Sequence, residues 1–457
     1  FTSTDGADLC RQILQGCMPH DTHDFQLSAI THLLDGQDVL MCTATGTGKT
    51  DTFIRLMHIV LAISENPSLA PGTKFPRHPA MVVVCPTKVL EEEMAEKMIK
   101  AGLTALAINA DTLDMARKKA LNLFKEALEG YHVLLVSPEL LKSSGFAGVL
   151  DSPKFSSRIC MLAVDEVHLV VTWGKSFRKD YEQIGVVRSR LRNIVPMIGV
   201  SATVRTGATT QRILEVLGFQ EGQYHILRRS NLRHDIHIIF RTMRSSIGGI
   251  KFPELNWVLA DRRKKVIFCN TIHFGFRVQS HLFRLPEAGP HRAKRIRMFN
   301  ALNWKTYNDQ TLKMFRDGDP DAQIIIATAI FSVGMDAPAF DDIIAFGEPV
   351  DVEQWLQQGG RIRPREGAND PRYITYVTAG AVAAAEGMVQ GPGSDAKTSM
   401  DPAMASIILA DCKINQLDKI FGNPQDDPPC SCTTCQIHPS PTRSSPCSCS
   451  GPSCQPE

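Results

Sequence analysis

Short apolar runs alternate with stretches of helical periodicity along most of the chain. Apolar runs of this length, separated by helices, are typical of parallel strands whose sheet is covered by helices on both faces. The strand–helix rhythm occurs twice, with a break near residues 220–233. The pattern therefore predicts an α/β fold of two doubly wound parallel-sheet domains in tandem. The predicted strands are 38–42, 81–85, 132–136, 159–164, 197–200, 236–240, 265–269, 323–327 and 342–346.

The composition changes after the second series of strands. Residues 379–401 are rich in Gly, Pro, Ser and other small residues, which indicates the end of the second domain. A short helical segment at 402–421 leads into a cysteine cluster, and the Pro/Ser/Cys-rich sequence after it is predicted to be disordered. The predicted organisation is two sheet domains, a small helical Cys-rich subdomain and a tail, at 1–225, 226–395, 396–438 and 439–457.

Composition and charge limit the class of protein. With 43% hydrophobic and 21% charged residues, the chain has the composition of a soluble globular protein. Charged residues, His or Pro interrupt the apolar runs before they reach the length of a membrane span, and the first residues lack a secretory signal. Because the first residue is Phe, we expect a fragment or an excised segment. A net charge of only +2 means that local basic clusters would have to hold a nucleic acid.

The strongest chemical signal is the sequence TATGTGKT at residues 43–50, between a predicted strand and a predicted helix. Glycines let such a loop turn its N–H groups toward phosphate oxygens, and the following helix N-terminus adds partial positive charge. The Lys reaches the β- and γ-phosphates, and the Thr after it ligates Mg²⁺. Thr43 stands where the general P-loop pattern has Gly. The predicted ATP- and Mg²⁺-binding residues are Thr45, Gly46, Thr47, Gly48, Lys49 and Thr50.

A second motif, MLAVDEVH, places two adjacent carboxylates at the end of an apolar strand. Because it follows a P-loop, we expect Asp165 to hold Mg²⁺, largely through water, and Glu166 to polarise the attacking water. His168 is expected to couple this pair to a third motif, Ser201-Ala-Thr, at the end of another strand. The hydroxyls of that third motif either bond to the carboxylates or cap the next helix.

These motifs resemble superfamily 2 helicases, and the sequence WGKSFRKDY at 173–181 narrows the resemblance to the RecQ family of DExH helicases. The resemblance implies RecA-like domains. Trp173 and Phe177 resemble the family's aromatic-rich loop, whose rings stack on unpaired bases, and Arg178 would pair with a phosphate or carboxylate. The sequence ATAIFSVGMD resembles motif V, in which Thr328 would hold a phosphate of the tracked strand.

Two further segments resemble the family but depart from its pattern. The sequence FQLSAI resembles the adenine-reading motif, in which Gln26 would pair with the purine edge, and His23 stands where the family has Arg. The sequence QQGGRIRPR resembles motif VI, whose arginines stabilise charge on the γ-phosphate. A proline occupies the last arginine position of this motif. The resemblance therefore assigns the role to Arg361 and to one of Arg363 and Arg365.

Six of the thirteen cysteines lie between Cys430 and Cys454, which indicates a metal site rather than the disulfide framework of a secreted protein. The sequence CKINQLDKIFG, followed by CSCTTC, resembles the RecQ zinc subdomain, in which a helical Cys and a Cys triplet surround a structural Zn²⁺. One residue between the first two cysteines of the triplet is an awkward spacing, so His438 is an alternative to either of them. The expected ligands are Cys412, Cys430, Cys432 and Cys435.

The resemblance implies an ATP- and Mg²⁺-dependent DNA helicase of 3′-to-5′ polarity that acts in recombination or repair in the nucleus. Single-stranded DNA and duplex junctions are the expected partners, and a membrane partner is not expected. Two alternatives stay open: an RNA-directed motor of the wider superfamily, and a DNA-binding remnant without enzymatic activity, which the proline in motif VI suggests.

Overall fold

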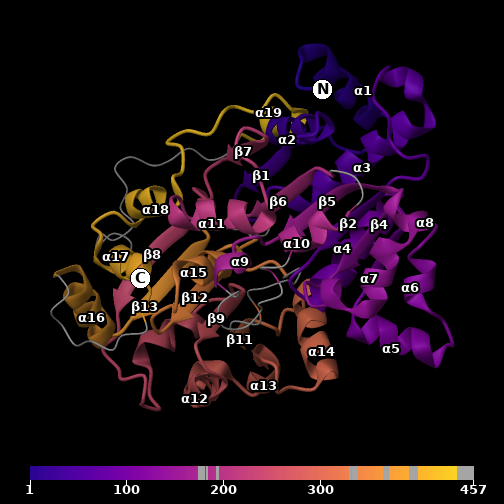
Figure 1. Ribbon diagram of the computed structural model, residues 1–457. Helices are drawn as coiled ribbons and strands as arrows, with labels where there is room; N and C mark the ends of the chain where they lie inside the picture. Colours follow the sequence, from indigo (N-terminus) through magenta and orange to yellow (C-terminus); the bar gives the residue numbers. More distant parts are fainter. Residues whose placement is uncertain are drawn as a thin grey trace. The chain divides into compact units, whose positions relative to one another are not determined.

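The computed structural model of the chain describes residues 1–172, 181, 184–191, 195–328, 331, 338–363, 370–390 and 400–439. These residues form two compact units (Figure 1). The first unit comprises Phe1–Asn231 together with 423–439, and the second comprises Leu232–Gly422. The segment 396–438, which the sequence predicts to be a separate subdomain, contributes residues to both units.

The first unit is built on a seven-stranded sheet. Its strands are β1 Asp38–Cys42, β2 Ala80–Val84, β3 Ala105–Ile108, β4 Val133–Val136, β5 Ile159–Asp165, β6 Met197–Ser201 and β7 Tyr224–Arg228. Their order is β3-β4-β2-β5-β6-β1-β7, and every neighbouring pair is parallel. Since β5, β6 and β1 are neighbours, the segments that follow these three strands leave the sheet side by side at its carboxyl edge.

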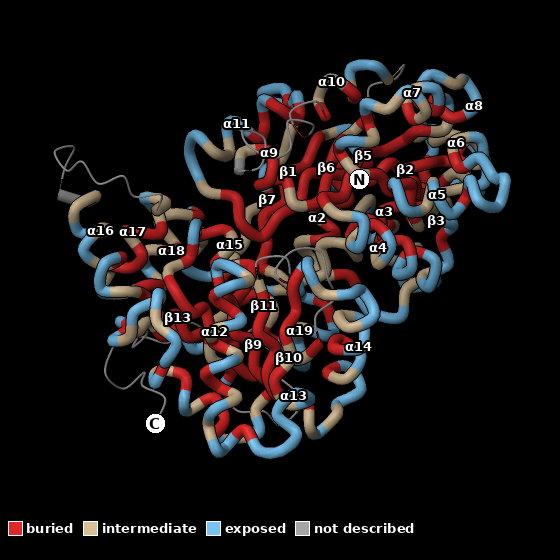
Figure 2. Tube along the Cα trace, turned by 90° about the horizontal axis from the view of Figure 1, so that it is seen from below, coloured by how far each residue is buried: buried red, intermediate tan, exposed pale blue. Residues whose placement is uncertain are grey.

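Helices cover both faces of this sheet. They are α1 Thr4–Gln15, α2 Asp24–Leu34, α3 Lys49–Glu65, α4 Lys88–Lys100, α5 Ala110–Lys118, α6 Leu123–Glu126, α7 Ser144–Asp151, α8 Pro153–Ser156, α9 Leu169–Thr172, α10 Ile184–Ser189, α11 Ala208–Leu217 and α19 Thr433–Ile437. Successive side chains of a strand point to opposite faces. Met41 and Val83 accordingly share a core with α1–α4, whereas Leu40 and Val82 share another with α7–α11. Figure 2 shows the strands as the most buried part of the chain.

The second unit repeats this plan with six strands, again parallel throughout, in the order β10-β11-β9-β12-β13-β8. The strands are β8 His237–Thr242, β9 Lys265–Cys269, β10 Ile296–Phe299, β11 Ile324–Ala327, β12 Asp342–Phe346 and β13 Arg372–Val377. The helices are α12 Ile272–Phe283, α13 Arg292–Arg295, α14 Lys305–Arg316, α15 Val352–Gly359, α16 Ala379–Gln390, α17 Pro402–Leu409 and α18 Lys413–Phe421.

The two parallel sheets confirm the predicted α/β fold class of two doubly wound domains. All nine predicted strands are present, with ends that differ by no more than two residues, and β3, β7, β10 and β13 were not predicted. None of the helices in the described ranges combines the length and the apolar character that crossing a membrane requires.

Candidate nucleotide and metal sites

The P-loop of the first unit, residues 43–48, joins the buried strand β1 to the helix α3. Gly46 and Gly48 both have a φ of 85°, a left-handed conformation that glycine adopts without the penalty of a Cβ atom. A Cβ on Gly48 would also lie 2.8 Å from Nε2 of Gln26. Since Gly48 immediately precedes α3, the unbonded N–H groups of the first helical turn face this loop. The loop thus has the backbone of a phosphate-binding site.

Side chains of the P-loop motif donate hydrogen bonds to backbone carbonyl oxygens of the same loop. Nζ of Lys49 donates to the carbonyl oxygens of Thr43, at 3.3 Å, and Ala44, at 2.9 Å. The hydroxyl of Thr47 donates to the same Ala44 oxygen and lies 2.9 Å from the Thr43 hydroxyl. Thr43, which replaces the usual Gly, therefore stabilises the loop through its side chain. Thr45 is half-buried at the turn of the loop.

Gln26, the predicted adenine-reading residue, is buried against the P-loop. Its amide N–H donates to the Gly48 carbonyl at 2.8 Å, and its side-chain oxygen accepts the backbone N–H of His23 at 3.1 Å. The Phe25 ring stacks on the His23 ring, with centroids 5.5 Å apart, and the Arg229 guanidinium lies 5.3 Å from the same Phe25 ring. The orientation of Gln26 is therefore fixed from two sides.

The carboxylates of the second motif lie at the end of β5. Burial, together with repulsion from Glu166, raises the pKa of Asp165 to about 7. Glu166 has a φ of 51°, which is unusual for a residue other than glycine, and its N–H donates to Oδ1 of Asp165 at 2.9 Å. A buried carboxylate beside a second one favours a nearby cation. With the half-buried hydroxyl of Thr50, these oxygens fit the hard ligands that Mg²⁺ prefers.

The third motif joins the other two. Nδ1 of His168 lies 2.9 Å from the Ser201 hydroxyl and 3.3 Å from Oε2 of Glu166. The Ser201 hydroxyl donates to the same Glu166 oxygen at 3.5 Å and accepts the Thr203 N–H at 3.1 Å. The Ser201 carbonyl accepts the N–H of Thr43 in the P-loop at 3.2 Å. The three motifs thus form one hydrogen-bonded site, and of the two alternatives for the third motif the structure shows the bond to a carboxylate.

The candidate residues of the second unit follow elements of its own sheet. Thr328 comes directly after β11 and is half-buried, as is Arg361, which lies just beyond α15. The Arg363 guanidinium donates to the carbonyl oxygens of Gly360, at 2.6 Å, and Ile362, at 2.9 Å. The remaining candidates of the nucleic-acid and motif VI sets lie outside the described residues: Trp173, Phe177, Arg178 and Arg365.

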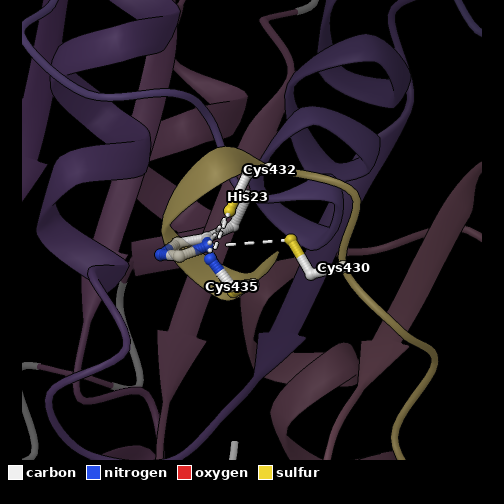
Figure 3. Close-up of side chains that lie close together, drawn as sticks. All are labelled: His23, Cys430, Cys432 and Cys435. Atoms are coloured by element: carbon white, nitrogen blue, oxygen red, sulfur yellow. Dashed lines mark hydrogen bonds between the residues drawn. The ribbon is translucent and has the colours of Figure 1, made fainter. Parts of the chain in front are cut away.

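Potential metal ligands cluster where the start of α2 meets the C-terminal segment of the first unit (Figure 3). The ligand atoms of His23, Cys430, Cys432 and Cys435 all lie within 4.8 Å of one another. Nδ1 of His23 is 3.7, 3.2 and 3.4 Å from the three sulfur atoms, in that order. Around a tetrahedral Zn²⁺, nitrogen and sulfur ligands are about 3.6 Å apart. Burial lowers the pKa of His23, which favours the neutral, ligating ring. The cluster fits a structural zinc ion.

This ligand set differs from the expected one at one position. The sequence assigned the fourth site to Cys412, which lies in the second unit, where its sulfur accepts the N–H of Asn415 at 3.4 Å and caps α18. Among the described residues, the group contains His23 instead, and His438 is not a member. Sequence reasoning noticed His23 only as a departure from the family's Arg. That departure was the one signal that pointed to it.

The one-residue spacing between the first two cysteines does not separate their sulfur atoms, contrary to expectation. Ser431, the residue between them, donates to the Asp24 carboxylate through its N–H, at 2.6 Å, and through its hydroxyl, at 2.8 Å. Cys432 is the N-cap residue of α19, and its sulfur accepts the N–H of Cys435 at 3.4 Å. The anchored serine and the helical turn bring all three sulfur atoms to one point, beside Nδ1 of His23.

Comparison with known proteins gives similarities over the same regions. The DEAD/DEAH box helicase family matches residues 23–211. The ATP-dependent DNA helicase RecQ of Haemophilus influenzae is 23% identical over 340 residues, which cover 74% of this chain and 48% of that protein. The ATP-dependent helicase SGS1 of Saccharomyces cerevisiae is 23% identical over 375 residues, which cover 80% of this chain and 23% of that protein. The chain spans about half the length of the bacterial relative.

Solved structures of helicases share the fold. The DUF1998 helicase MrfA, bound to DNA and AMPPNP, has a TM-score of 0.63 at 15% identity, and the match covers 92% of this chain and 58% of that one. Saccharomyces cerevisiae Dbp5, bound to RNA and ADP BeF3, has a TM-score of 0.58 at 15% identity, with 81% and 87% covered. These matches agree with two sheets of RecA-like helicase type.

Proposed function

Because this chain carries a DEAD/DEAH box helicase domain and is related to RecQ helicases, we propose that it is an ATP-dependent DNA helicase. We further propose that it moves 3′ to 5′ along single-stranded DNA and acts in recombination or repair. The observation that carries the ATP-driven part of this proposal is the joining of three motifs at one sheet edge, through the Ser201 contacts with His168, Glu166 and Thr43. The polarity and the role in recombination or repair rest on the resemblance to RecQ helicases.

We assign the separate roles in ATP binding and hydrolysis to residues of the first unit. The P-loop N–H groups and Lys49 bind the phosphates, once Lys49 exchanges its carbonyl partners for phosphate oxygens. Thr50 and Asp165 would hold Mg²⁺, which supplies charge neutralisation during phosphoryl transfer. Glu166 orients the attacking water. Through His168, the state of Glu166 is passed to the strand end at Ser201.

The second unit supplies residues whose roles rest on the RecQ resemblance. We assign stabilisation of the transferring phosphoryl charge to Arg361, with Arg363 or Arg365 as the second arginine. DNA contacts are assigned to Thr328 of this unit and to the aromatic-rich loop of the first unit, with Trp173 and Phe177 stacking on bases and Arg178 pairing with phosphate.

Phosphate release by the purified chain tests the enzymatic part of the proposal. Turnover should require Mg²⁺, increase with single-stranded DNA, and fall by about 10²-fold or more in Lys49→Ala and Glu166→Gln. Glu166→Gln should still bind ATP, because the substitution removes the group that polarises water and leaves the phosphate cradle. DNA binding without any turnover that depends on Lys49 would instead show a DNA-binding remnant.

Strand displacement tests polarity and nucleic-acid class. Two duplexes are compared, one with a single-stranded tail at the 3′ end of the loading strand and one with a tail at the 5′ end. The chain should unwind the duplex with the 3′ tail and not the one with the 5′ tail. The same substrates made of RNA serve as the comparison. Equal stimulation and unwinding with RNA would reject the DNA-specific assignment, and unwinding only from the 5′ tail would reject the polarity.

A further inference from the structure

The C-terminal segment 423–439, here called the strap, crosses back onto the first unit and packs beside α2 (Figure 1). Besides the bonds between Ser431 and Asp24, both the N–H and the hydroxyl of Thr433 donate to the Asp21 carboxylate. The Asp24 N–H in turn points at the sulfur of Cys430, at 3.3 Å. Polar contacts therefore position the strap on both sides of His23.

The strap is held at its beginning as well. The carboxylate of Asp427 accepts the N–H of Ser230 at 2.8 Å and lies 3.3 Å from the guanidinium of Arg229. The side-chain amide of Asn423 donates to Asn231 at 2.9 Å. The three cysteines are thus presented to His23 by a segment that is anchored along its length, not by a loose end.

His23 is connected by two short steps to the P-loop. Its backbone N–H donates to the side-chain oxygen of Gln26 at 3.1 Å. The amide of Gln26 then donates to the carbonyl of Gly48 at 2.8 Å, and Gly48 is the residue that opens α3. A group that fixes the His23 ring therefore also fixes the backbone N–H that orients Gln26.

We propose that His23, Cys430, Cys432 and Cys435 form a zinc site that clamps the strap to α2 and orders Gln26 for nucleotide binding. The ligand assignment stands on the cluster geometry alone. The link to nucleotide binding rests on the proposed ATP site. The site places a metal between the C-terminal strap and the adenine-reading motif, and it makes nucleotide affinity depend on zinc.

Metal content and the Co²⁺ spectrum test the ligands. The loss variant is His23→Asn, because Asn is a good helix N-cap and keeps the start of α2 while it removes the ligating ring. Its zinc affinity should fall by about 100-fold or more. In His23→Cys, zinc should be retained, and the thiolate-to-Co²⁺ charge-transfer band should rise by about a third, as three thiolates become four.

Two control variants separate this ligand set from the one expected from the sequence. Cys412→Ser keeps the capping function of that residue on α18, since Ser is also a good N-cap, and should keep its zinc. His20→Ala removes an exposed histidine near α2 and should also keep its zinc. Loss of zinc from Cys412→Ser with retention in His23→Asn would overturn the assignment, as would a wild-type chain that binds no zinc.

Equilibrium binding of a fluorescent ATP analogue tests the coupling. Chelation of zinc, or His23→Asn, should weaken the affinity by about fivefold or more, whereas His23→Cys should match the wild type. In Gln26→Ala, zinc removal should have little further effect, because the connecting side chain is gone. Equal affinities with and without zinc would overturn the coupling. A chain that binds zinc through these residues but no nucleotide would overturn the proposed ATP site and leave the metal assignment intact.

Discussion

In the nucleotide site, the P-loop, the paired carboxylates and Ser201 all lie at the carboxyl ends of strands of one sheet, whereas the metal cluster joins His23 to cysteines that are 407 to 412 positions away. The order of the parallel strands is enough to place the three motifs at one sheet edge, where their side chains then make specific contacts. The cluster depends on a particular packing of the strap on α2, through pairs such as Asp24 and Ser431. Motif spacing is therefore a sound guide to the first site and a poor guide to the second.

The largest expected effect is on ATP turnover, from a substitution that disrupts the nucleotide site and leaves the metal site intact. Lys49→Ala should lower ATP turnover by about 10²–10³-fold, because one positioned cationic donor to the transferring phosphate is lost. Its zinc content should not change, since Lys49 donates to carbonyl oxygens of the P-loop and is not a member of the metal-ligand cluster. Steady-state phosphate release and metal analysis measure the two outcomes. Lys100→Ala, an exposed lysine at the end of α4, is the control. Loss of zinc in Lys49→Ala would contradict the independence of the two sites.

Removal of the metal is the converse experiment. Cys432→Ser, or chelation, should lower the free energy of unfolding of the first unit by about 3–4 kcal/mol when zinc is present at a few hundred times its dissociation constant. The reason is that zinc binds the folded cluster and not the unfolded chain. Calorimetry at fixed zinc concentration gives the value. Cys17→Ser, at an exposed cysteine of the first unit, should leave the unfolding temperature unchanged.

The buried carboxyl of Glu91, at the start of α4, makes the stability of the first unit depend on pH, independently of the nucleotide and metal sites. Burial raises the pKa of its carboxyl from 4.5 to about 8, although a hydrogen bond from Asn109 opposes the shift. The folded chain therefore holds a proton that the unfolded chain releases, so stability declines as the pH rises from about 4.5 to about 8. Glu91→Gln should remove about 3 kcal/mol of the decline between pH 5.5 and 8.5.

Denaturant midpoints between pH 5.5 and 8.5 measure the Glu91 effect. The exposed neighbour Glu92 provides the matched control, because Glu92→Gln should leave the pH dependence as it is in the wild type. The buried Asp165 carboxyl, with its pKa of about 7, should leave a smaller slope of the same sign in Glu91→Gln. A wild-type chain whose stability rises over this range would contradict the assignment to buried, protonated carboxyls.

The smallest expected effect concerns the link between motifs. Ser201→Ala removes the hydroxyl that contacts both His168 and Glu166, and turnover should fall by about five- to tenfold, the worth of about one hydrogen bond. Ser201→Thr restores a hydroxyl and should recover part of the loss. Turnover and analogue affinity, measured together, distinguish a lost relay from a lost binding contact. Unchanged turnover in Ser201→Ala would show that the hydroxyl serves only to hold the Thr203 N–H.

The sequence predicted the fold class and the nine strands that consist of continuous apolar runs. Three of the four strands it missed are edge strands whose sequences explain the omission. The sequence ALAI of β3 is rich in Ala and reads as helix, YHILR of β7 mixes His and Arg with apolar residues, and IRMF of β10 follows a basic run. These strands form because an adjacent sheet edge accepts them, which local pattern does not reveal.

The candidate sites also divide into residues that local pattern identifies and residues that come together only through tertiary packing. The P-loop residues and Ser201 lie at strand ends, which local pattern indicates, and of the two roles that the sequence left open for Ser201 the structure shows the bond to Glu166. The sequence found three of the four clustered metal ligands from a local triplet. It did not identify His23 as a ligand, since no spacing rule connects positions 23 and 430 and the only signal was the departure from the family's Arg. The fourth cysteine of the family pattern has instead become a helix cap, at Cys412.

The division of the chain has a consequence for how it can be shortened. The second unit is an insertion between two parts of the first, and the chain leaves and re-enters the first unit at Asn231 and Asn423, whose side chains are hydrogen-bonded. A truncation at Gly422 would therefore remove a segment that belongs to the first unit. It would remove three of the four clustered ligands, together with Asp427, which pairs with Arg229, and Ser431, which bonds to Asp24. The first unit would lose the strap that completes it.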